Sequence, residues 1–319
     1  MASGSSGESS ASPTSTVTGA PTETGAADTL GEDSSSADTT TTEPQTCAAD
    51  LLVAGQHNGL EIEHDGVIRT YNLYVPVGND GTEPAPLVLN FHGFGSNAPQ
   101  QQFFSNMDPT ADEYGLVVAY PEGLDNSWNA GTCCGTSATN GVDDVGFAVA
   151  VIADAKSRAC IDSRRVYATG MSNGGFLSHR LACEAAESVA AIAPVAGVIG
   201  IPLAECNPSR PVPVLHFHGT LDSLVAYEGG AMGPGAVDTV AAWSERDGCV
   251  GDPAQSFAEA EVHCEASNDC NGDARTELCT IEGGGHCWPG VSFCPFGVST
   301  VTINASDRMA AFFAEFTLP

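Results

Sequence analysis

The sequence predicts an α/β domain built on a mostly parallel, doubly wound β-sheet. Strand-like and helix-like segments alternate from residue 66 onward, a pattern typical of successive β-α-β units. Several strand-like segments are short, continuous apolar runs, as expected for strands buried on both faces. The stretch "YATGMSNGGF" at residues 167–176 places glycines around a serine where a strand meets a helix, and glycine favours tight backbone corners.

The first half of the domain contains three expected strands and one helix. Residues 67–76 alternate apolar and polar side chains, which predicts an edge or antiparallel strand. Residues 86–93 and 116–123 are apolar runs ending in glycine, so we expect buried strands there. Residues 143–157 change to apolar side chains three to four positions apart, which predicts a helix.

The second half repeats the alternation. Apolar runs predict strands, and helical spacing of apolar residues predicts the helices between them. Ser306 precedes the last helical segment and is a suitable N-cap residue. The expected strands are 164–170, 189–197, 212–219 and 277–286, and the expected helices are 173–186, 236–248 and 306–316.

The first 46 residues differ from the rest of the chain. They contain no aromatic and no basic residue and are rich in Ser, Thr, Gly and acidic residues. Such a segment buries too little apolar surface to offset the entropy of ordering, so residues 1–46 are predicted to be a disordered tether. Residues 47–319 are predicted to form one catalytic domain. No run of 18 apolar residues is present, so we expect no membrane span.

Twelve cysteines predict an oxidising environment, and with the tether they suggest a secreted or cell-surface protein. No CxxC pair occurs, which favours disulfides over zinc. Six cysteines lie between residues 249 and 294 and can close among themselves as three bridges. Cys133 and Cys134 are adjacent, and we expect them to take different partners. Residues 269–277 resemble a calcium loop, but the glycine is misplaced, so we expect no metal and no cofactor.

The formal net charge is −30, from 40 acidic and 10 basic residues. This balance argues against a nucleic-acid backbone or an anionic membrane as the partner. It favours solubility, and its self-repulsion is relieved by salt. We expect a monomer.

Residues 170–174 read G-x-S-x-G, with an expected strand before and an expected helix after. This is the context of a nucleophile elbow, in which a sharp strand-to-helix turn exposes the serine hydroxyl above the sheet. Ser172 is therefore the candidate nucleophile. The alternative is a helix cap by Ser172, worth about 1 kcal/mol.

A serine nucleophile needs a base, and in α/β-hydrolases the order along the chain is Ser, then Asp or Glu, then His. His286 ends the last expected strand in "GGGHCWPG", where glycines and a cysteine can aim and fasten a loop. It is the expected general base. His216 and His218 alternate on a strand, which favours packing roles. The other histidines after the serine are His179 and His263.

The acid of the triad is expected on a loop that follows a strand. Asp222 lies three residues beyond Gly219, at the end of an expected strand, and would orient the imidazole of the base. Asp247 and Asp252 are the competitors, and we interpret both as solvated turn residues.

The oxyanion of the reaction needs backbone N–H donors. One donor is expected from the residue after the nucleophile, Asn173, and the other from the loop after the third strand of the fold. The sequence "HGFG" at residues 92–95 occupies that loop, so Phe94 is the second candidate. A plain turn at residues 92–93 is the alternative.

His92, Trp128 and Trp288 lie near the expected mouth of the site. Trp288 is two residues beyond the candidate base, and Trp128 follows a strand. Aromatic rings at such places can stack a flat or polymeric substrate. We expect these three residues to contact substrate, and burial in the core is the alternative.

An ordered set of motifs resembles the polyhydroxybutyrate depolymerase and feruloyl esterase group, related to carbohydrate esterase family one. The motifs are "NFHGFGSN", "DNSWNAGTCCG", "VDDVGF", "RRVYATGMSNGGF", "AAIAPVAG", "HFHGTLDSLVAY" and "IEGGGHCWPG", within residues 50–317. The resemblance implies an α/β-hydrolase fold and secreted carboxylic-ester hydrolysis. It assigns the triad to Ser172, Asp222 and His286, and it supports Phe94 and Asn173 as the oxyanion hole.

The combined prediction is a secreted serine esterase that cleaves polymer-linked esters through an acyl-enzyme. Its expected partner is a polyester of the polyhydroxybutyrate type. The alternative substrate is a feruloyl or acetyl ester on plant cell-wall polysaccharide. A non-catalytic polymer-binding module and a peptidase of the same fold are the further alternatives.

Overall fold

The computed structural model describes residues 47–48 and 50–319, and the predicted tether at 1–46 lies outside the described residues. The described part contains ten strands in one sheet. The strands are β1 (Gly55–His64), β2 (Val67–Val75), β3 (Ala85–Phe91), β4 (Val117–Pro121), β5 (Ile161–Met171), β6 (Ala191–Val195), β7 (Val214–Gly219), β8 (Ala254–Glu259), β9 (Val262–Ser267) and β10 (Thr276–Ile281).

Helices occupy most of the connections between the parallel strands. The helices are α1 (Ala98–Ser105), α2 (Asp108–Tyr114), α3 (Gly135–Asn140), α4 (Asp144–Arg158), α5 (Asn173–Glu184), α6 (Ala236–Arg246) and α7 (Ala305–Phe313). Short 3-10 turns are η1 (Leu124–Asn126), η2 (Ala186–Ser188) and η3 (Asn271–Asp273).

The strand order is β1-β2-β4-β3-β5-β6-β7-β10-β9-β8. The six central strands, from β4 to β10, pair in parallel, while β1 and β2 at one edge and β9 and β8 at the other are antiparallel. The mostly parallel, doubly wound sheet predicted from the sequence is therefore confirmed. The antiparallel strand expected at 67–76 is present as β2, but β1 forms the edge beyond it.

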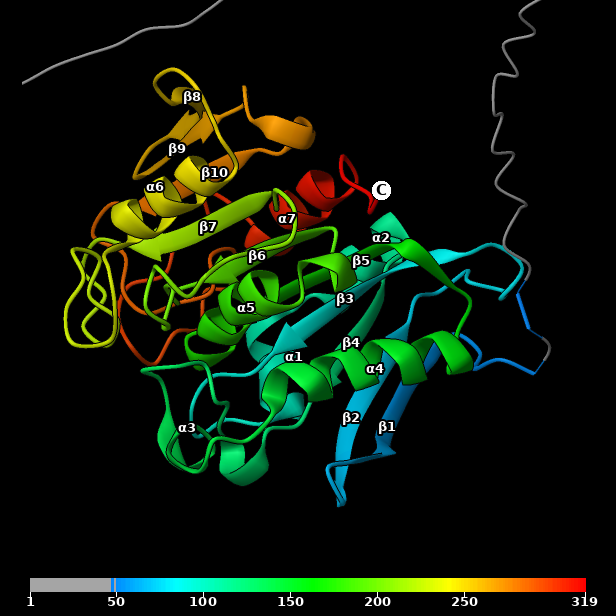
Figure 1. Ribbon diagram of the computed structural model, residues 1–319. Coiled ribbons are helices and arrows are strands. Elements are labelled where there is room, and N and C mark those ends of the chain that lie inside the picture. Colours follow the sequence, from blue (N-terminus) through cyan, green and yellow to red (C-terminus); the bar gives the residue numbers. More distant parts are fainter. Residues whose placement is uncertain (1–46, 49) are drawn as a thin grey trace, which may run out of the picture. The chain divides into compact units, whose positions relative to one another are not determined.

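Helices cover both faces of the sheet. Figure 1 shows α4, α5 and α6 on the near face and α7 on the opposite one. Alternate side chains of β3 divide between two cores: Leu87 and Leu89 face the α4–α6 side, and Val88 faces the side of α2 and α7. A strand with apolar residues at every position is thus buried on both faces.

A buried ion pair fixes α4 against the sheet. Arg69 of β2 and Asp144 of α4 lie 2.8 Å apart with almost no exposure, and the guanidinium stacks 3.6 Å from the ring centre of Phe147. The second Asp144 oxygen accepts from the Asn129 N–H at 2.7 Å. The acidic "VDDVGF" segment therefore joins α4 to the loop that carries Trp128.

Several local expectations were wrong. The strands β1, β8 and β9 and the helices α1, α2 and α3 were not predicted from the sequence. Ser306 does not cap α7, because the helix begins one residue earlier and the Asn304 side chain accepts from the N–H groups of residues 306 and 307. Asp247 is buried, not solvated, and its Oδ1 accepts from the Val212 N–H at 3.0 Å. Burial raises the pKa of Asp247 to about 7.

All twelve cysteines are paired. The last six close among themselves as expected, in the pairs 249–270, 264–279 and 287–294. Cys47 bonds Cys160, and the fifth pair is 183–206. The expectation for Cys133 and Cys134 was wrong, because they bond each other across a cis peptide that brings their Cα atoms to 3.1 Å.

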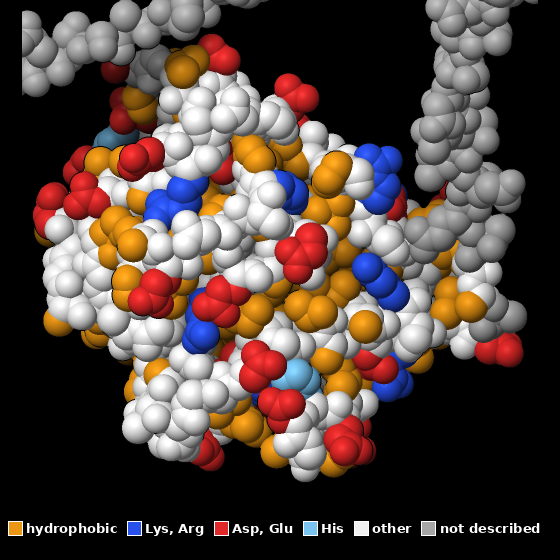
Figure 2. All heavy atoms as spheres, in the orientation of Figure 1, with side chains coloured by type: hydrophobic (Ala, Val, Ile, Leu, Met, Phe, Trp, Pro, Cys, Tyr) orange, Lys and Arg blue, Asp and Glu red, His pale blue; other side chains and the backbone are white. Residues whose placement is uncertain are grey.

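The surface reflects the acidic composition. Figure 2 shows acidic side chains spread over the visible face and no cluster of basic ones there. In the part of the chain that the structure describes, no helix has the length and apolarity needed to cross a membrane.

Candidate active site

The predicted nucleophile stands at a sharp corner between β5 and α5. Ser172 has φ 56° and ψ −122°, a conformation that a non-glycine residue rarely adopts. A side chain at Gly170 would lie 2.6 Å from the Phe91 carbonyl oxygen, and one at Gly174 would collide with the same group. The glycines therefore allow β3, β5 and α5 to meet. The Ser172 hydroxyl makes no capping bond to α5, so the alternative role as an N-cap is not supported.

The predicted acid and base are hydrogen-bonded to each other. His286 Nδ1 and Asp222 Oδ2 lie 2.7 Å apart, and both side chains are almost fully buried. The other oxygen, Asp222 Oδ1, accepts the N–H groups of residues 224 and 225, each at 2.8 Å. Burial alone would raise the pKa of Asp222, but the hydrogen bond and charge of His286 hold it below its usual value. The carboxylate is therefore ionised and held in one orientation.

Neighbouring strands bring the two loops together. β7 and β10 pair in parallel, so the loops that follow them leave the same edge of the sheet. The loop after β7 carries Asp222 and is called the acid loop; the loop after β10 carries His286 and is called the base loop. The Leu221 N–H donates to the Gly284 carbonyl at 2.8 Å, which joins the two loops. The base loop is held further by the bond from the His286 N–H to the Phe296 carbonyl, at 3.1 Å, and by the disulfide between Cys287 and Cys294.

A row of buried rings, which the sequence did not lead us to expect as a unit, leads from α6 toward the acid. Trp243 Nε1 donates to His179 Nδ1 at 3.0 Å. His179 Nε2 lies 3.4 Å from His216 Nδ1, and His216 Nε2 lies 3.0 Å from His218 Nδ1. An indole N–H can only donate, so His179 Nδ1 accepts and its proton lies on Nε2. The same reasoning passes from His179 to His216 and from His216 to His218, so each imidazole is the neutral tautomer with its proton on Nε2.

The row ends beside the carboxylate. His218 Nε2 donates to the Val225 carbonyl at 2.8 Å and lies 3.5 Å from Asp222 Oδ2. Burial lowers the pKa of His218, and it lowers the pKa of His179 to about 3. These histidines are therefore neutral packing residues that support the acid loop, as their strand position suggested for His216 and His218. The only sequence signal was the alternation "HFHG" before the loop.

The loop predicted to supply an oxyanion donor lies directly beside the nucleophile. A Cβ built on Gly93 would lie 3.4 Å from Ser172 Cβ. Among the described residues, neither the Phe94 nor the Asn173 N–H donates to a protein acceptor. The Asn173 side chain accepts from the Trp128 N–H at 2.7 Å and donates to the Trp128 carbonyl at 3.0 Å, which fixes the start of α5.

The expected substrate contacts of His92 and Trp128 are not supported, because both side chains are fully buried and neither lines the cavity. Trp128 Nε1 donates to the His92 carbonyl at 2.8 Å. His92 Nε2 accepts from the Gly123 N–H at 2.9 Å, which leaves Nδ1 to donate to the Gly93 carbonyl at 2.8 Å. Both buried side chains therefore hold the "HGFG" loop in place through hydrogen bonds to its backbone carbonyls.

A cavity of about 240 Å³ opens over these elements. Ser172 and His286 both line it, as do the Phe94 side chain and Trp288. Trp288 lines the cavity but is only 3% exposed, and its Nε1 donates to the Ser306 hydroxyl at 3.1 Å. The remaining wall is largely apolar.

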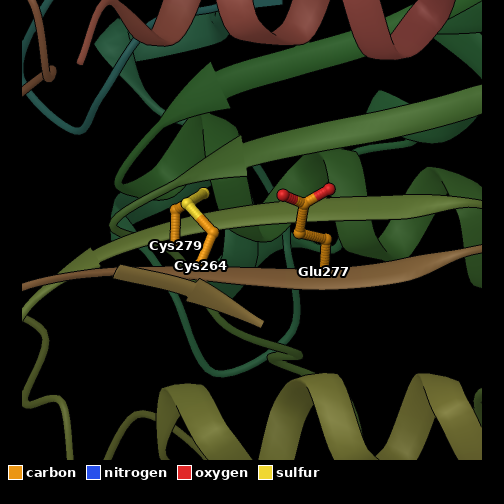
Figure 3. Close-up of side chains that lie close together, drawn as sticks. All are labelled: Cys264, Glu277 and Cys279. Atoms are coloured by element: carbon orange, nitrogen blue, oxygen red, sulfur yellow. A yellow bond between two sulfur atoms is a disulfide. The ribbon is translucent and has the colours of Figure 1, made fainter. Parts of the chain in front are cut away.

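Two groups of side chains in the described residues have the spacing of metal ligands. One consists of Cys264, Glu277 and Cys279, but Figure 3 shows the two sulfur atoms bonded to each other, so neither is a thiolate ligand. The other is His64, Asp65 and Asp143, where both carboxylates are exposed. Neither group lines the cavity.

The fold and the corner at residue 172 place the protein in the α/β-hydrolase class. The central strands are parallel, Ser172 lies at a strained strand-to-helix turn, and the candidate acid and base follow it in the order of that class. Comparison with known proteins agrees. A structure of acetyl xylan esterase from Aspergillus awamori, 16% identical, superposes with a TM-score of 0.57 over 77% of this chain and 94% of its own.

The chain belongs to the polyhydroxybutyrate depolymerase and feruloyl esterase group. A family model described as "Esterase PHB depolymerase" matches residues 69–208. The putative esterase NocK of Nocardia uniformis subsp. tsuyamanensis is 31% identical, over 85% of this chain and 80% of NocK. Feruloyl esterase B of Piromyces equi is 35% identical over 66% of this chain, which spans 41% of that longer protein.

Proposed function

We propose that this protein is a serine carboxylesterase that cleaves polymer-linked esters through an acyl-enzyme. The observation that carries the proposal is the buried hydrogen bond between Asp222 and His286, at the wall of the cavity that the strained Ser172 also lines. Acyl transfer needs an ionised acid, an oriented imidazole and a serine whose hydroxyl is not used to cap a helix, beside free backbone N–H groups.

The reaction begins with attack of Ser172 Oγ on the ester carbonyl carbon. His286 Nδ1 is engaged by Asp222, so Nε2 is the atom that takes the serine proton. The carbonyl oxygen becomes an oxyanion, which accepts hydrogen bonds from the Phe94 and Asn173 N–H groups. His286 then gives the proton to the leaving alcohol as the ester C–O bond breaks. A water attacks the acyl-enzyme with His286 as the base, and the bond to Ser172 breaks to release the carboxylic acid and the free serine.

Replacing the nucleophile tests this assignment. Ser172→Ala is expected to lower the kcat for a chromogenic short-chain ester by about a millionfold, because no group is left to form the acyl-enzyme. Ser157→Ala on α4 is the matched control, since its exposed hydroxyl bonds only the Asp154 carbonyl. Turnover by Ser172→Ala near that of the control would overturn the proposal.

The first substrate candidate is a polyester of the polyhydroxybutyrate type. It is supported by the match to the depolymerase family model and by exposed apolar side chains at the cavity, including Phe94 at 59% and Phe296 at 50%. Exposed aromatic surface of this kind favours contact with an apolar polymer.

The second candidate is a feruloyl or acetyl ester on plant cell-wall polysaccharide. The names of two relatives favour it: feruloyl esterase B and, at 33% identity over 51% of this chain, the acetylxylan esterase/xylanase of Neocallimastix patriciarum. Relative kcat/KM for methyl ferulate and for a hydroxybutyrate oligomer separates the two candidates.

We also propose that the protein acts outside the cell, either free or tethered to the surface. Six disulfides among the described residues support an oxidising location. Fractionation of the host tests this, and recovery in the cytosol with reduced thiols would contradict it.

A further inference from the structure

The cavity wall contains few polar side chains. Those that line it are Ser96, Gln101, Ser172 and His286, and no Lys, Arg, Asp or Glu among the described residues does so. The proposed reaction uses the last two. Ser96 donates its hydroxyl proton to Gln100 Oε1 at 3.0 Å. Gln101 is therefore the buried polar group left to recognise a polar feature of the substrate.

Two side chains, Asn90 and Met107, fix the orientation of the Gln101 amide. Its Nε2 donates to Asn90 Oδ1 at 2.7 Å, and Asn90 Nδ2 donates to Met107 Sδ at 3.6 Å. A thioether sulfur only accepts, so the Asn90 amide must turn its NH₂ to the sulfur and its oxygen to Gln101. One N–H of Gln101 is then committed to Asn90.

The remaining polar atom, Gln101 Oε1, has no donor. Gln101 is only 1% exposed and lines the cavity. None of the described residues donates a hydrogen bond to this oxygen. Because Gln101 lines the cavity, this oxygen is available to a donor on a bound molecule. The bond to Asn90 keeps the amide from exchanging the positions of its oxygen and nitrogen.

We propose that Gln101 Oε1 accepts a hydrogen bond from a hydroxyl group on an otherwise uncharged, apolar acyl group of the substrate. The inference rests on the proposed esterase function and names a specificity-determining residue for it. The walls near Gln101 include Phe104 and Phe293, whose rings stack at 6.1 Å with an interplanar angle of 4°. They suit the apolar body of either a hydroxyaryl or a hydroxyalkanoyl group.

A site that hydrogen-bonds a substrate hydroxyl discriminates against the analogue that lacks it. Two pairs of esters, each differing by one hydroxyl, measure this: methyl p-coumarate with methyl cinnamate, and methyl β-hydroxybutyrate with methyl butyrate. In one pair, the wild type is expected to favour the hydroxylated member by about 10- to 100-fold in kcat/KM, as one buried hydrogen bond allows. The pair that shows the preference identifies the acyl class.

Gln101→Met keeps the length of the side chain and removes both the acceptor and the N–H that bonds Asn90. It is expected to abolish the preference by slowing only the hydroxylated ester, with the other rate within about threefold of wild type. The matched control is Gln102→Met, one position along α1, where the side chain bonds Gln56 and Asp108 and does not line the cavity. This control is expected to retain the preference.

Equal wild-type rates within both pairs would overturn the inference without any variant. A preserved preference in Gln101→Met, or an equal loss on both members of a pair, would also overturn it, because the second result indicates a structural role. Ser172→Ala keeps the two proposals separate. If Ser172→Ala is inactive and the wild type shows no hydroxyl preference, the esterase proposal stands and only the proposed role of Gln101 is refuted.

Discussion

Removing the buried imidazole of His92 tests whether the loop beside the nucleophile depends on a neutral histidine. The ring accepts from the Gly123 N–H and donates to the Gly93 carbonyl, so it must carry one proton only. Burial lowers the pKa of His92 to about 4. The variant His92→Gln keeps a donor and an acceptor but cannot titrate.

The magnitude follows from the difference in pKa between the two states. The unfolded histidine has a pKa of about 6.5 and the folded one about 4. Between these values the unfolded chain binds the extra proton, so this contribution to stability is present above pH 6.5 and is lost as the pH falls toward 4. From about pH 7.5 to pH 5, wild type loses about 2 kcal/mol of unfolding free energy through His92 alone.

The assay is urea unfolding at about pH 7.5 and pH 5, followed by tryptophan fluorescence, for wild type and His92→Gln with the disulfides intact. Other titrating groups are common to both proteins and cancel in the comparison. The destabilisation caused by the variant is expected to be about 2 kcal/mol smaller at pH 5 than at pH 7.5. The same destabilisation at both pH values would refute the neutral, buried state of His92.

Three further substitutions test the site and its support. Asp222→Asn is expected to lower kcat for a soluble ester about ten-thousandfold, because the amide favours the imidazole tautomer that cannot accept the serine proton. Steady-state kinetics measures this, and a loss below tenfold would contradict the triad. Trp128→Phe removes the donor to the His92 carbonyl and is expected to cost about 1–3 kcal/mol of unfolding free energy with KM unchanged. A raised KM without loss of stability would instead support a direct contact between Trp128 and substrate. Asp144→Ala leaves the buried Arg69 without its partner and is expected to cost about 3–5 kcal/mol in urea unfolding, whereas a loss under 1 kcal/mol would contradict the buried pair.

Patterns along the chain were sufficient for features that depend on local geometry. The strand-to-helix corner at Ser172 requires small neighbours on either side, so its signature is short and contiguous. The position of Asp222 followed from the rule that the loops of parallel strands gather at one edge. The central strands were predictable because burial on both faces demands an uninterrupted apolar run.

Side-chain burial at the strand ends was decided by contacts between distant segments. His92 and Trp128 are fully buried beneath the loop, whereas Trp288, although only 3% exposed, lines the cavity. The free oxygen of Gln101 exists because Asn90 and Met107, from other segments, fix its amide. No periodicity within α1 carries that information.

The sequence by itself determined the fold class, and it predicted the candidate nucleophile, acid and base. Uninterrupted apolar runs mark the buried strands, and each candidate lies at or just beyond the end of one of them. The tertiary structure alone decided which polar groups face the cavity, which histidines stay neutral inside, and the pairing of Cys133 with Cys134. Those properties arise where strands and loops far apart along the chain pack together and exclude water, and burial there sets both the available hydrogen bonds and the charge of each group.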